Sequence, residues 1–96
     1  MIEYEKIPIL KKGVVLRETA NRKLLLIPEG YIELDDVSWD ILRRCDGIKK
    51  LGEIIEELKS AYTGDPKIIE EDTLQLLMEL KKECLLDFFS SGKQKE

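Results

Sequence analysis

Histidine is absent from the 96 residues of this sequence, and cysteine occurs only twice. The usual zinc sites combine cysteine and histidine ligands, so this chain has too few of them for such a site. Cys45 and Cys84 stand alone inside apolar, helix-like patterns. We expect both to be small buried hydrophobic residues, with a disulfide between them disfavoured in a reducing compartment. The sequence therefore predicts no metal and no cofactor.

Long hydrophobic runs and glycine-rich loops are also missing. No window approaches the roughly 20 apolar residues that a membrane-spanning helix needs, and the mixed, acidic start MIEYEKIPIL is unlike a signal peptide. A cytoplasmic location is the expectation. No histidine can serve as a base, and no serine or cysteine has a nucleophile setting, so the sequence predicts no enzyme. The densest carboxylate cluster, Glu70–Asp72, is typical of a solvated helix face.

Charged side chains are abundant and unevenly distributed. They make up 38% of the chain, with a net charge of −4. Residues 35–88 carry 8 Lys or Arg against 14 Asp or Glu. A protein surface that binds nucleic acid needs clustered positive charge to meet the phosphates. The acidic half of this chain therefore argues against a nucleic-acid partner.

Two apolar runs, Leu24–Ile27 and Tyr31–Asp35, flank the triplet Pro28-Glu29-Gly30. Proline favours the first central position of a turn, and glycine favours its left-handed position, so the two runs predict an antiparallel hairpin. The β-branched and apolar residues of Gly13–Glu18 predict a strand before it. We interpret the segment around Ile7-Pro8-Ile9 as an extended arm, because Pro8 cannot donate a hydrogen bond to a sheet.

From Asp36 onwards the hydrophobic period becomes helical. One helix of about ten residues follows the cap residues Asp35 and Asp36 and is expected to stop at Asp46-Gly47. A second begins near Leu51 without a capping side chain, since Lys50 stands where serine or threonine would be. A third runs from Asp65-Pro66 to about Cys84. One apolar line of this helix predicts a core face, and a second lies beside it: Ile69, Thr73, Leu76, Leu77, Leu80 and Cys84, then Leu74 and Met78.

These elements predict one α+β domain over residues 1–88, in which a three-stranded antiparallel β-meander precedes a three-helix bundle of winged-helix-like shape. The apolar segment Leu85–Phe89 is expected to pack back on the bundle. Residues 89–96 are expected to form a flexible C-terminal tail.

The segment PEGYIELDDVSWDILRRCDGIKKLGEII resembles the coenzyme PQQ synthesis protein D (PqqD) family of peptide-recognition domains. The similarity extends over roughly residues 8–88. It rests on an ordered set of short motifs: Pro28-Glu29-Gly30, Ile32, Leu34-Asp35, Ile41-Leu42, Asp46-Gly47, Glu53-Ile54, Tyr62, Asp72, Leu76-Leu77, Leu80 and Leu85-Leu86. The sequence departs from the family pattern where Asp35 replaces asparagine, Val37 and Lys50 replace threonine, and Ser38 replaces alanine.

The resemblance implies a non-catalytic peptide chaperone. Such proteins bind the leader of a ribosomally made precursor peptide and present it to a modifying enzyme, which in the PQQ pathway is a radical S-adenosylmethionine enzyme. The leader would add as a strand beside the third strand of the meander and lie against the third helix. Ile32 and Leu34 are expected on the core face, with Tyr31 and Glu33 opposite. The peptide-binding residues so implied are Tyr31, Ile32, Glu33, Leu34, Asp35, Leu74, Leu77, Met78 and Lys81.

Two alternatives stay open on sequence alone. A winged-helix nucleic-acid-binding domain has a similar set of elements, although the acidic helical half opposes it. A generic protein-interaction domain without a peptide substrate is the other. The sequence leaves open which precursor and which partner enzyme are involved, and whether the exposed edge strand pairs two copies in a homodimer.

Overall fold

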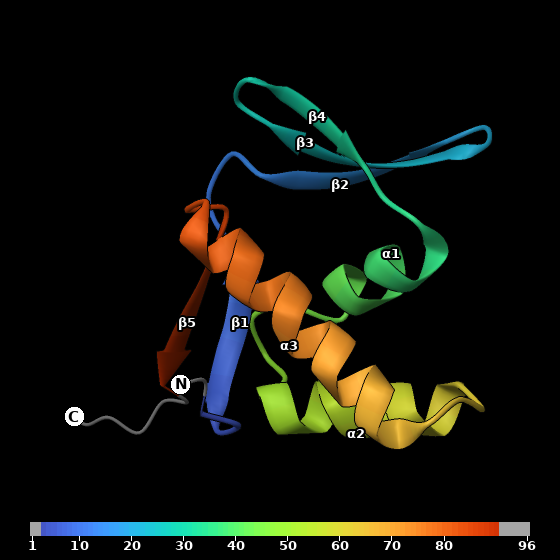
Figure 1. Ribbon diagram of the computed structural model, residues 1–96. Coiled ribbons are helices and arrows are strands. Elements are labelled where there is room, and N and C mark those ends of the chain that lie inside the picture. The colour runs from blue at the N-terminus through green and yellow to red at the C-terminus, as the bar shows by residue number, and fades with distance from the viewer. Residues whose placement is uncertain (1–2, 91–96) are drawn as a thin grey trace.

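The computed structural model describes residues 3–90. The domain consists of two small sheets and three helices (Figure 1). The elements follow one another in the order β1 (Lys6–Leu10), β2 (Val15–Thr19), β3 (Arg22–Ile27), β4 (Gly30–Glu33), α1 (Asp36–Arg43), α2 (Leu51–Ala61), α3 (Pro66–Lys82) and β5 (Leu86–Ser90).

The antiparallel meander β2–β3–β4 confirms the hairpin prediction. In its register Leu25, at the centre, pairs with Leu16 on one side and Ile32 on the other, and Leu25 is fully buried. Gly30 has a φ of 153°, in the region that favours glycine, where β4 leaves the turn. The three strands and three helices of the predicted α+β fold are present. The winged-helix comparison stays a prediction.

A second sheet, formed by β1 and β5, was not expected from the sequence. The interpretation of Ile7–Ile9 as an extended arm is wrong, because this segment is strand β1. Lys11 N donates to the Leu85 carbonyl, and hydrogen-bonded pairs alternate along an antiparallel ladder. Pro8 and Phe88 therefore form a pair without ladder hydrogen bonds, so the missing N–H of Pro8 costs this ladder nothing.

Strand β5 ends at Ser90, two residues beyond the expected domain boundary. Its pairing with β1 is the way in which the apolar end of the chain packs back on the domain. The remainder of the expected tail, 91–96, lies outside the described residues, and the division of the chain into 1–88 and 89–96 stays a prediction.

Helix α1 is shorter than its apolar pattern indicated. Asp35 caps its start, where the Asp35 Oδ1 accepts a hydrogen bond from Ser38 N at 2.7 Å. The helix ends at Arg43, so Asp46-Gly47 is not its stop signal. Asp46 instead forms a turn in which its carboxylate accepts hydrogen bonds from the backbone N–H groups of the two residues that follow Gly47.

Gly47 allows strand β1 to approach this turn. Its φ is 82°, and a Cβ at this position would lie 2.8 Å from Ile9 Cδ1. Ile9 also forms an isolated antiparallel bridge with Asp46. The Asp-Gly pair therefore fixes the packing of β1 on the α1–α2 connection.

The starts of α2 and α3 follow the sequence closely. The Lys50 side chain has no acceptor with which to cap α2. The Lys50 backbone N–H instead donates a hydrogen bond to Glu53 Oε1 at 2.8 Å, which forms one half of a capping box. At the start of α3, Asp65 accepts from Lys67 N at 2.9 Å, and Pro66 occupies the first turn as predicted.

The end of α3 corrects the prediction for Cys84. This residue is exposed and has a φ of 64°, whereas Cys45 is buried as predicted. Leu85 N donates to the Leu80 carbonyl, and Cys84 N donates to the Lys81 carbonyl, the pattern of a Schellman cap. Cys84 thus occupies the left-handed position where glycine is preferred.

One apolar core lies between the meander and the helices. Burial raises the pKa of the Cys45 thiol within it to about 12. Among residues 3–90, no helix combines the length and the apolar character needed to cross a membrane. In the same range, no group of three or more potential metal-binding side chains comes together. The core consists of Val14, Leu25, Ile41, Leu42, Cys45, Leu51, Ile54, Ile55, Leu58, Leu77, Leu80 and Leu86.

Candidate functional site: the β4 edge and the α1–α3 groove

Strand β4 is at the edge of the meander, with β3 as its neighbour in the sheet. Leu34 N donates to the Lys23 carbonyl at 2.8 Å, which fixes the hydrogen-bonding phase of β4. Because this phase alternates along an antiparallel pair, Ile32 turns its backbone N–H and C=O towards β3, whereas Tyr31 and Glu33 turn theirs outwards. Four backbone groups therefore line the open edge, where an added strand would satisfy them.

The side chains of β4 confirm the predicted alternation of faces. Of the two residues predicted on the core face, Leu34 is half-buried and packs against the core, whereas Ile32 is not buried as predicted. Ile32 lies on the same face as buried Leu25, opposite the face of Tyr31 and Glu33. Nevertheless, Ile32 is 38% exposed and Tyr31 is 55% exposed. On the outer face, the Arg22 guanidinium lies 5.3 Å from the Tyr31 ring centroid and forms an ion pair with Glu33 at 3.4 Å.

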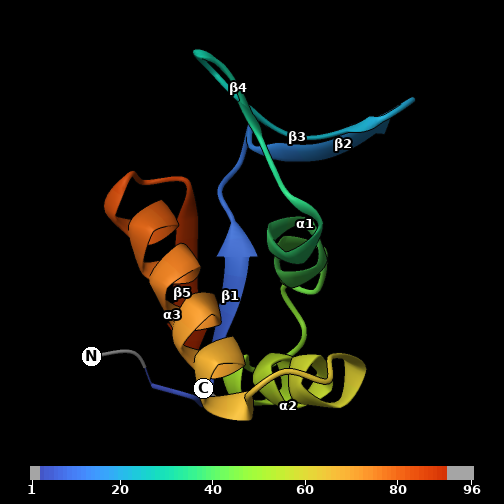
Figure 2. The same cartoon turned by 45° about the vertical axis from the view of Figure 1, so that its right-hand side comes forward.

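A groove runs between α1 and α3, starting where β4 ends. Figure 2 shows the chain passing from β4 directly into α1. The groove consists of two adjoining cavities that share Val37, Ile41 and Asp72. The cavity beside β4 measures about 330 Å³ and is lined by Asp35, Val37, Ser38, Ile41, Asp72, Gln75, Leu76 and Glu79. The cavity beyond it measures about 250 Å³ and is lined by Val37, Ile41, Leu58, Tyr62, Thr63, Gly64, Ile69, Asp72 and Thr73.

The charged residues that line this groove are all acidic: Asp35, Asp72 and Glu79. Among residues 3–90, neither the Asp72 nor the Glu79 side chain forms an ion pair or a hydrogen bond. Hydrogen bonds from Ser38 lower the pKa of Asp35, so this carboxylate is ionised at neutral pH. The groove is thus apolar along its floor and negative at its rim.

The predicted α3 contacts Leu74, Met78 and Lys81 lie on the other side of this helix from the groove. Lys81 forms an ion pair with Asp87 of β5 at 2.9 Å. Leu77 is fully buried in the core, whereas Met78 is 45% exposed. None of these four residues lines the groove, and their peptide-binding role stays a prediction.

Of the predicted site residues, Asp35 is the one that meets α3 side chains at the groove. The sequence reasoning missed the groove residues Val37, Ile41, Asp72, Gln75 and Glu79. The signal that could have found the α3 side was the spacing of Asp72, Gln75, Leu76 and Glu79, which places them along one side of a helix.

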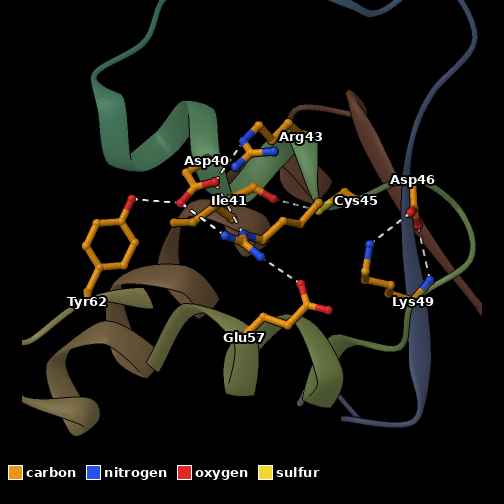
Figure 3. Close-up of polar contacts among 9 residues, drawn as sticks. Asp40, Ile41, Arg43, Cys45, Asp46, Lys49, Glu57 and Tyr62 are labelled. Atoms are coloured by element: carbon orange, nitrogen blue, oxygen red, sulfur yellow. Dashed lines mark hydrogen bonds and ion pairs between the residues drawn. The ribbon is translucent and has the colours of Figure 1, made fainter. Parts of the chain in front are cut away.

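A polar network holds α1 against α2 and so fixes one wall of the groove (Figure 3). Tyr62 Oη donates to Asp40 Oδ2 at 2.8 Å. Arg43 Nε lies 2.8 Å from Asp40 Oδ1, and Arg44 bridges Asp40 and Glu57, with its Nη1 2.7 Å from Glu57 Oε1. Because Tyr62 also lines the groove, the network connects the groove wall directly to α2.

The charges of this network stabilise one another. Partial burial raises the pKa of Asp40, but the hydrogen bond from Tyr62 and the interaction with Arg44 outweigh it and leave that pKa below its usual value. The hydrogen bond to Asp40 raises the pKa of Tyr62. At neutral pH, therefore, Asp40 is ionised and Tyr62 is protonated, as the hydrogen bond between them requires.

Comparison with known sequences identifies relatives over most of the chain. Residues 22–86 match the model of the family "Coenzyme PQQ synthesis protein D (PqqD)". A PqqA binding protein of Xanthomonas oryzae is 35% identical over 81 residues, which cover 82% of this chain and 88% of that protein. The bifunctional coenzyme PQQ synthesis protein C/D of Methylorubrum extorquens is 37% identical over 84% of this chain, and the match spans 22% of that longer protein.

Solved structures show the same fold. The solution NMR structure of the PqqD truncation of Methylobacterium extorquens PqqCD, described as a functional and stand-alone RiPP recognition element, has a TM-score of 0.75 at 34% identity. That match covers 91% of this chain and 95% of that structure. The structure of TbiB1 in complex with the TbiA(beta) leader peptide has a TM-score of 0.67 at 25% identity. This match covers 86% of this chain and 99% of that structure. With sequence, family and fold in agreement, the chain belongs to the coenzyme PQQ synthesis protein D (PqqD) family.

Proposed function

We propose that this protein is a leader-peptide-binding domain that presents a ribosomally synthesised precursor peptide to a modifying enzyme. The open edge of β4, with the outward backbone groups of Tyr31 and Glu33, is the observation that carries the proposal. Relatives named PqqA binding protein and a neighbour in complex with a leader peptide support it.

In this proposal the leader adds to the meander as a fourth strand next to β4. Its backbone supplies the hydrogen bonds that the edge lacks, which gives affinity with little dependence on sequence. Specificity then requires side-chain contacts, and the α1–α3 groove beginning at Asp35 is the cavity adjacent to this edge. The domain has no catalytic role of its own, and the modifying enzyme is a radical S-adenosylmethionine protein. The cytoplasmic location stays a prediction.

The acidic rim of the groove supports a peptide ligand over nucleic acid. Phosphate groups placed near Asp35, Asp72 and Glu79 would be repelled. Binding of mixed duplex DNA at low salt would contradict this expectation.

The test is a pair of substitutions at Glu33. Glu33→Pro removes an N–H that points away from β3, so the meander keeps its own hydrogen bonds while the edge loses a donor. Glu33→Ala is the matched control, because it removes the same carboxylate and keeps the N–H. We expect Glu33→Pro to weaken binding of a candidate precursor peptide at least tenfold, about 1.4 kcal/mol, and Glu33→Ala to change it little.

Titration calorimetry measures these affinities, and circular dichroism checks that both variants are folded. If Glu33→Pro is folded and binds the precursor as tightly as the wild type does, the leader does not pair with β4.

A further inference from the structure

The two cavities between α1 and α3 form a groove whose chemistry indicates what occupies it. From sequence and structure, we propose that the groove binds the leader segment that precedes the strand paired with β4, and that it selects a lysine or arginine there beside an apolar residue. This inference rests on the proposed function, because it extends the path of the same peptide beyond the β4 edge.

Continuity with the edge is the first argument. Asp35 follows the extended run of β4 directly, caps α1 and lines the nearer cavity. A peptide that leaves the β4 edge at this end therefore passes directly into the groove. The further cavity continues the path towards Tyr62, Thr63 and Gly64.

The direction of the peptide follows from the sheet. The meander is antiparallel throughout, and antiparallel pairing is more stable per residue than parallel pairing. A guest strand antiparallel to β4 starts at the Asp35 end and finishes near Gly30. Residues on the N-terminal side of the guest strand therefore lie in the groove, and the C-terminal part of the precursor leaves at the Pro28-Glu29-Gly30 turn.

Charge complementarity determines the residue type. Asp72 and Glu79 lie two helical turns apart with Leu76 between them, and Asp35 faces them from the start of α1. No lysine or arginine lines either cavity, and Asp35 accepts its hydrogen bond from Ser38 at the start of α1, so no cation in the lining compensates Asp72 or Glu79. An apolar side chain fits against Val37 and Leu76, and a cation beside it meets the rim.

The test compares two double variants with the same change in net charge. Asp72→Asn with Glu79→Gln neutralises the rim of the groove, whereas Glu56→Gln with Glu71→Gln neutralises two exposed carboxylates that do not line it. We expect the first pair to weaken binding of the precursor peptide about fivefold at about 50 mM salt, and the difference to shrink at high salt. The second pair should bind as the wild type does.

A substitution in the peptide completes a double-mutant cycle with the groove variant. Replacing the basic residue on the N-terminal side of the pairing strand by alanine should cause the same loss in the wild type and almost none in the Asp72→Asn/Glu79→Gln protein. Equal affinity of the wild type and that double variant at low salt overturns the inference.

The Glu33→Pro variant separates this result from failure of the proposed function. If the inference alone fails, the wild type binds the precursor, Glu33→Pro disrupts binding and the neutralised groove has no effect. If leader binding itself fails, the wild type shows no affinity for the precursor. If only the pairing with β4 fails, folded Glu33→Pro binds the precursor as tightly as the wild type does.

Discussion

The two sheets of this domain use their strands in opposite ways. The β1–β5 sheet joins segments about 80 positions apart in sequence and contributes the buried side chains Ile7, Pro8 and Leu86. The meander is local in sequence, and every residue of its last strand, β4, is exposed. The first sheet closes the fold, whereas the second leaves backbone groups available to a ligand. Stability and binding are therefore assigned to different strands, and substitutions can test them separately.

The largest expected effect is on the closing sheet. Leu86→Ala empties a fully buried position, and we expect it to lower the free energy of unfolding by about 2–5 kcal/mol. The matched variant Ile32→Ala in β4 should cost less than about 1 kcal/mol, because that side chain is already 38% exposed. Urea titration followed by circular dichroism measures both. Equal losses in the two variants would remove the distinction between the sheets.

Binding should depend on the side of α3 that faces α1. Leu76→Ala shortens a side chain that lines the groove, and we expect it to weaken precursor binding about tenfold, or roughly 1.4 kcal/mol. Met78→Ala, on the opposite side of the helix, should change affinity less than twofold. The sequence interpretation, which places the leader against Leu74 and Met78, gives the reverse order. Calorimetric titration of both variants decides between the two sides.

The network that anchors α1 should have a smaller, pH-dependent effect. Tyr62→Phe removes the hydrogen bond to Asp40 and should lower the free energy of unfolding by about 1 kcal/mol at pH 7. The pKa of Asp40 is lowered in the fold, so this stabilisation is present above the usual pKa of aspartate and is lost as the pH falls through the folded value.

At alkaline pH the ionisation of Tyr62 has the opposite effect, because the stabilisation then decreases as the pH rises. The pKa of Tyr62 is raised in the fold, so its contribution is full below the usual tyrosine pKa of about 10 and is lost as the pH rises through the folded value. The stability difference between the wild type and Tyr62→Phe should therefore be largest between about pH 5 and pH 9. A difference that is constant from pH 3 to pH 11 would show that the stabilisation is not linked to the ionisation of Asp40 or Tyr62.

The smallest expected effect is at the end of α3, where the chain turns into β5. Cys84→Gly places glycine at a φ of 64°, and we expect it to raise the free energy of unfolding by about 0.5 kcal/mol. Thermal unfolding of both proteins under reducing conditions measures the change. A loss of stability on this substitution would mean that the cysteine side chain makes contacts that outweigh its backbone strain.

What the sequence predicted well was local. The Pro28-Glu29-Gly30 turn, the cap of α1 at Asp35 and the cap of α3 at Asp65 depend on residues that are neighbours in the chain, and all of them are present. The β1–β5 ladder could not be predicted in this way, because the register that spares Pro8 depends on residues at the other end of the chain.

The groove was missed for a related reason. An apolar pattern shows that a helix has a buried face, but not which flank of that face lines a groove. Lys81 was placed beside the leader on helical spacing alone, whereas its partner Asp87 comes from the unexpected strand β5. Asp72 and Glu79 are ordinary surface residues in sequence, and only the position of α1 makes them the rim of a groove.

The pairing of Lys6 with Ser90 has a consequence for how the domain can be joined to other proteins. Both described ends of the chain lie at the far end of the molecule from the meander (Figures 1 and 2). A modifying enzyme fused near either end would therefore leave the β4 edge uncovered while it raises the local concentration of the domain beside its active site. In this geometry, separate and fused versions of the domain can present the same open β4 edge.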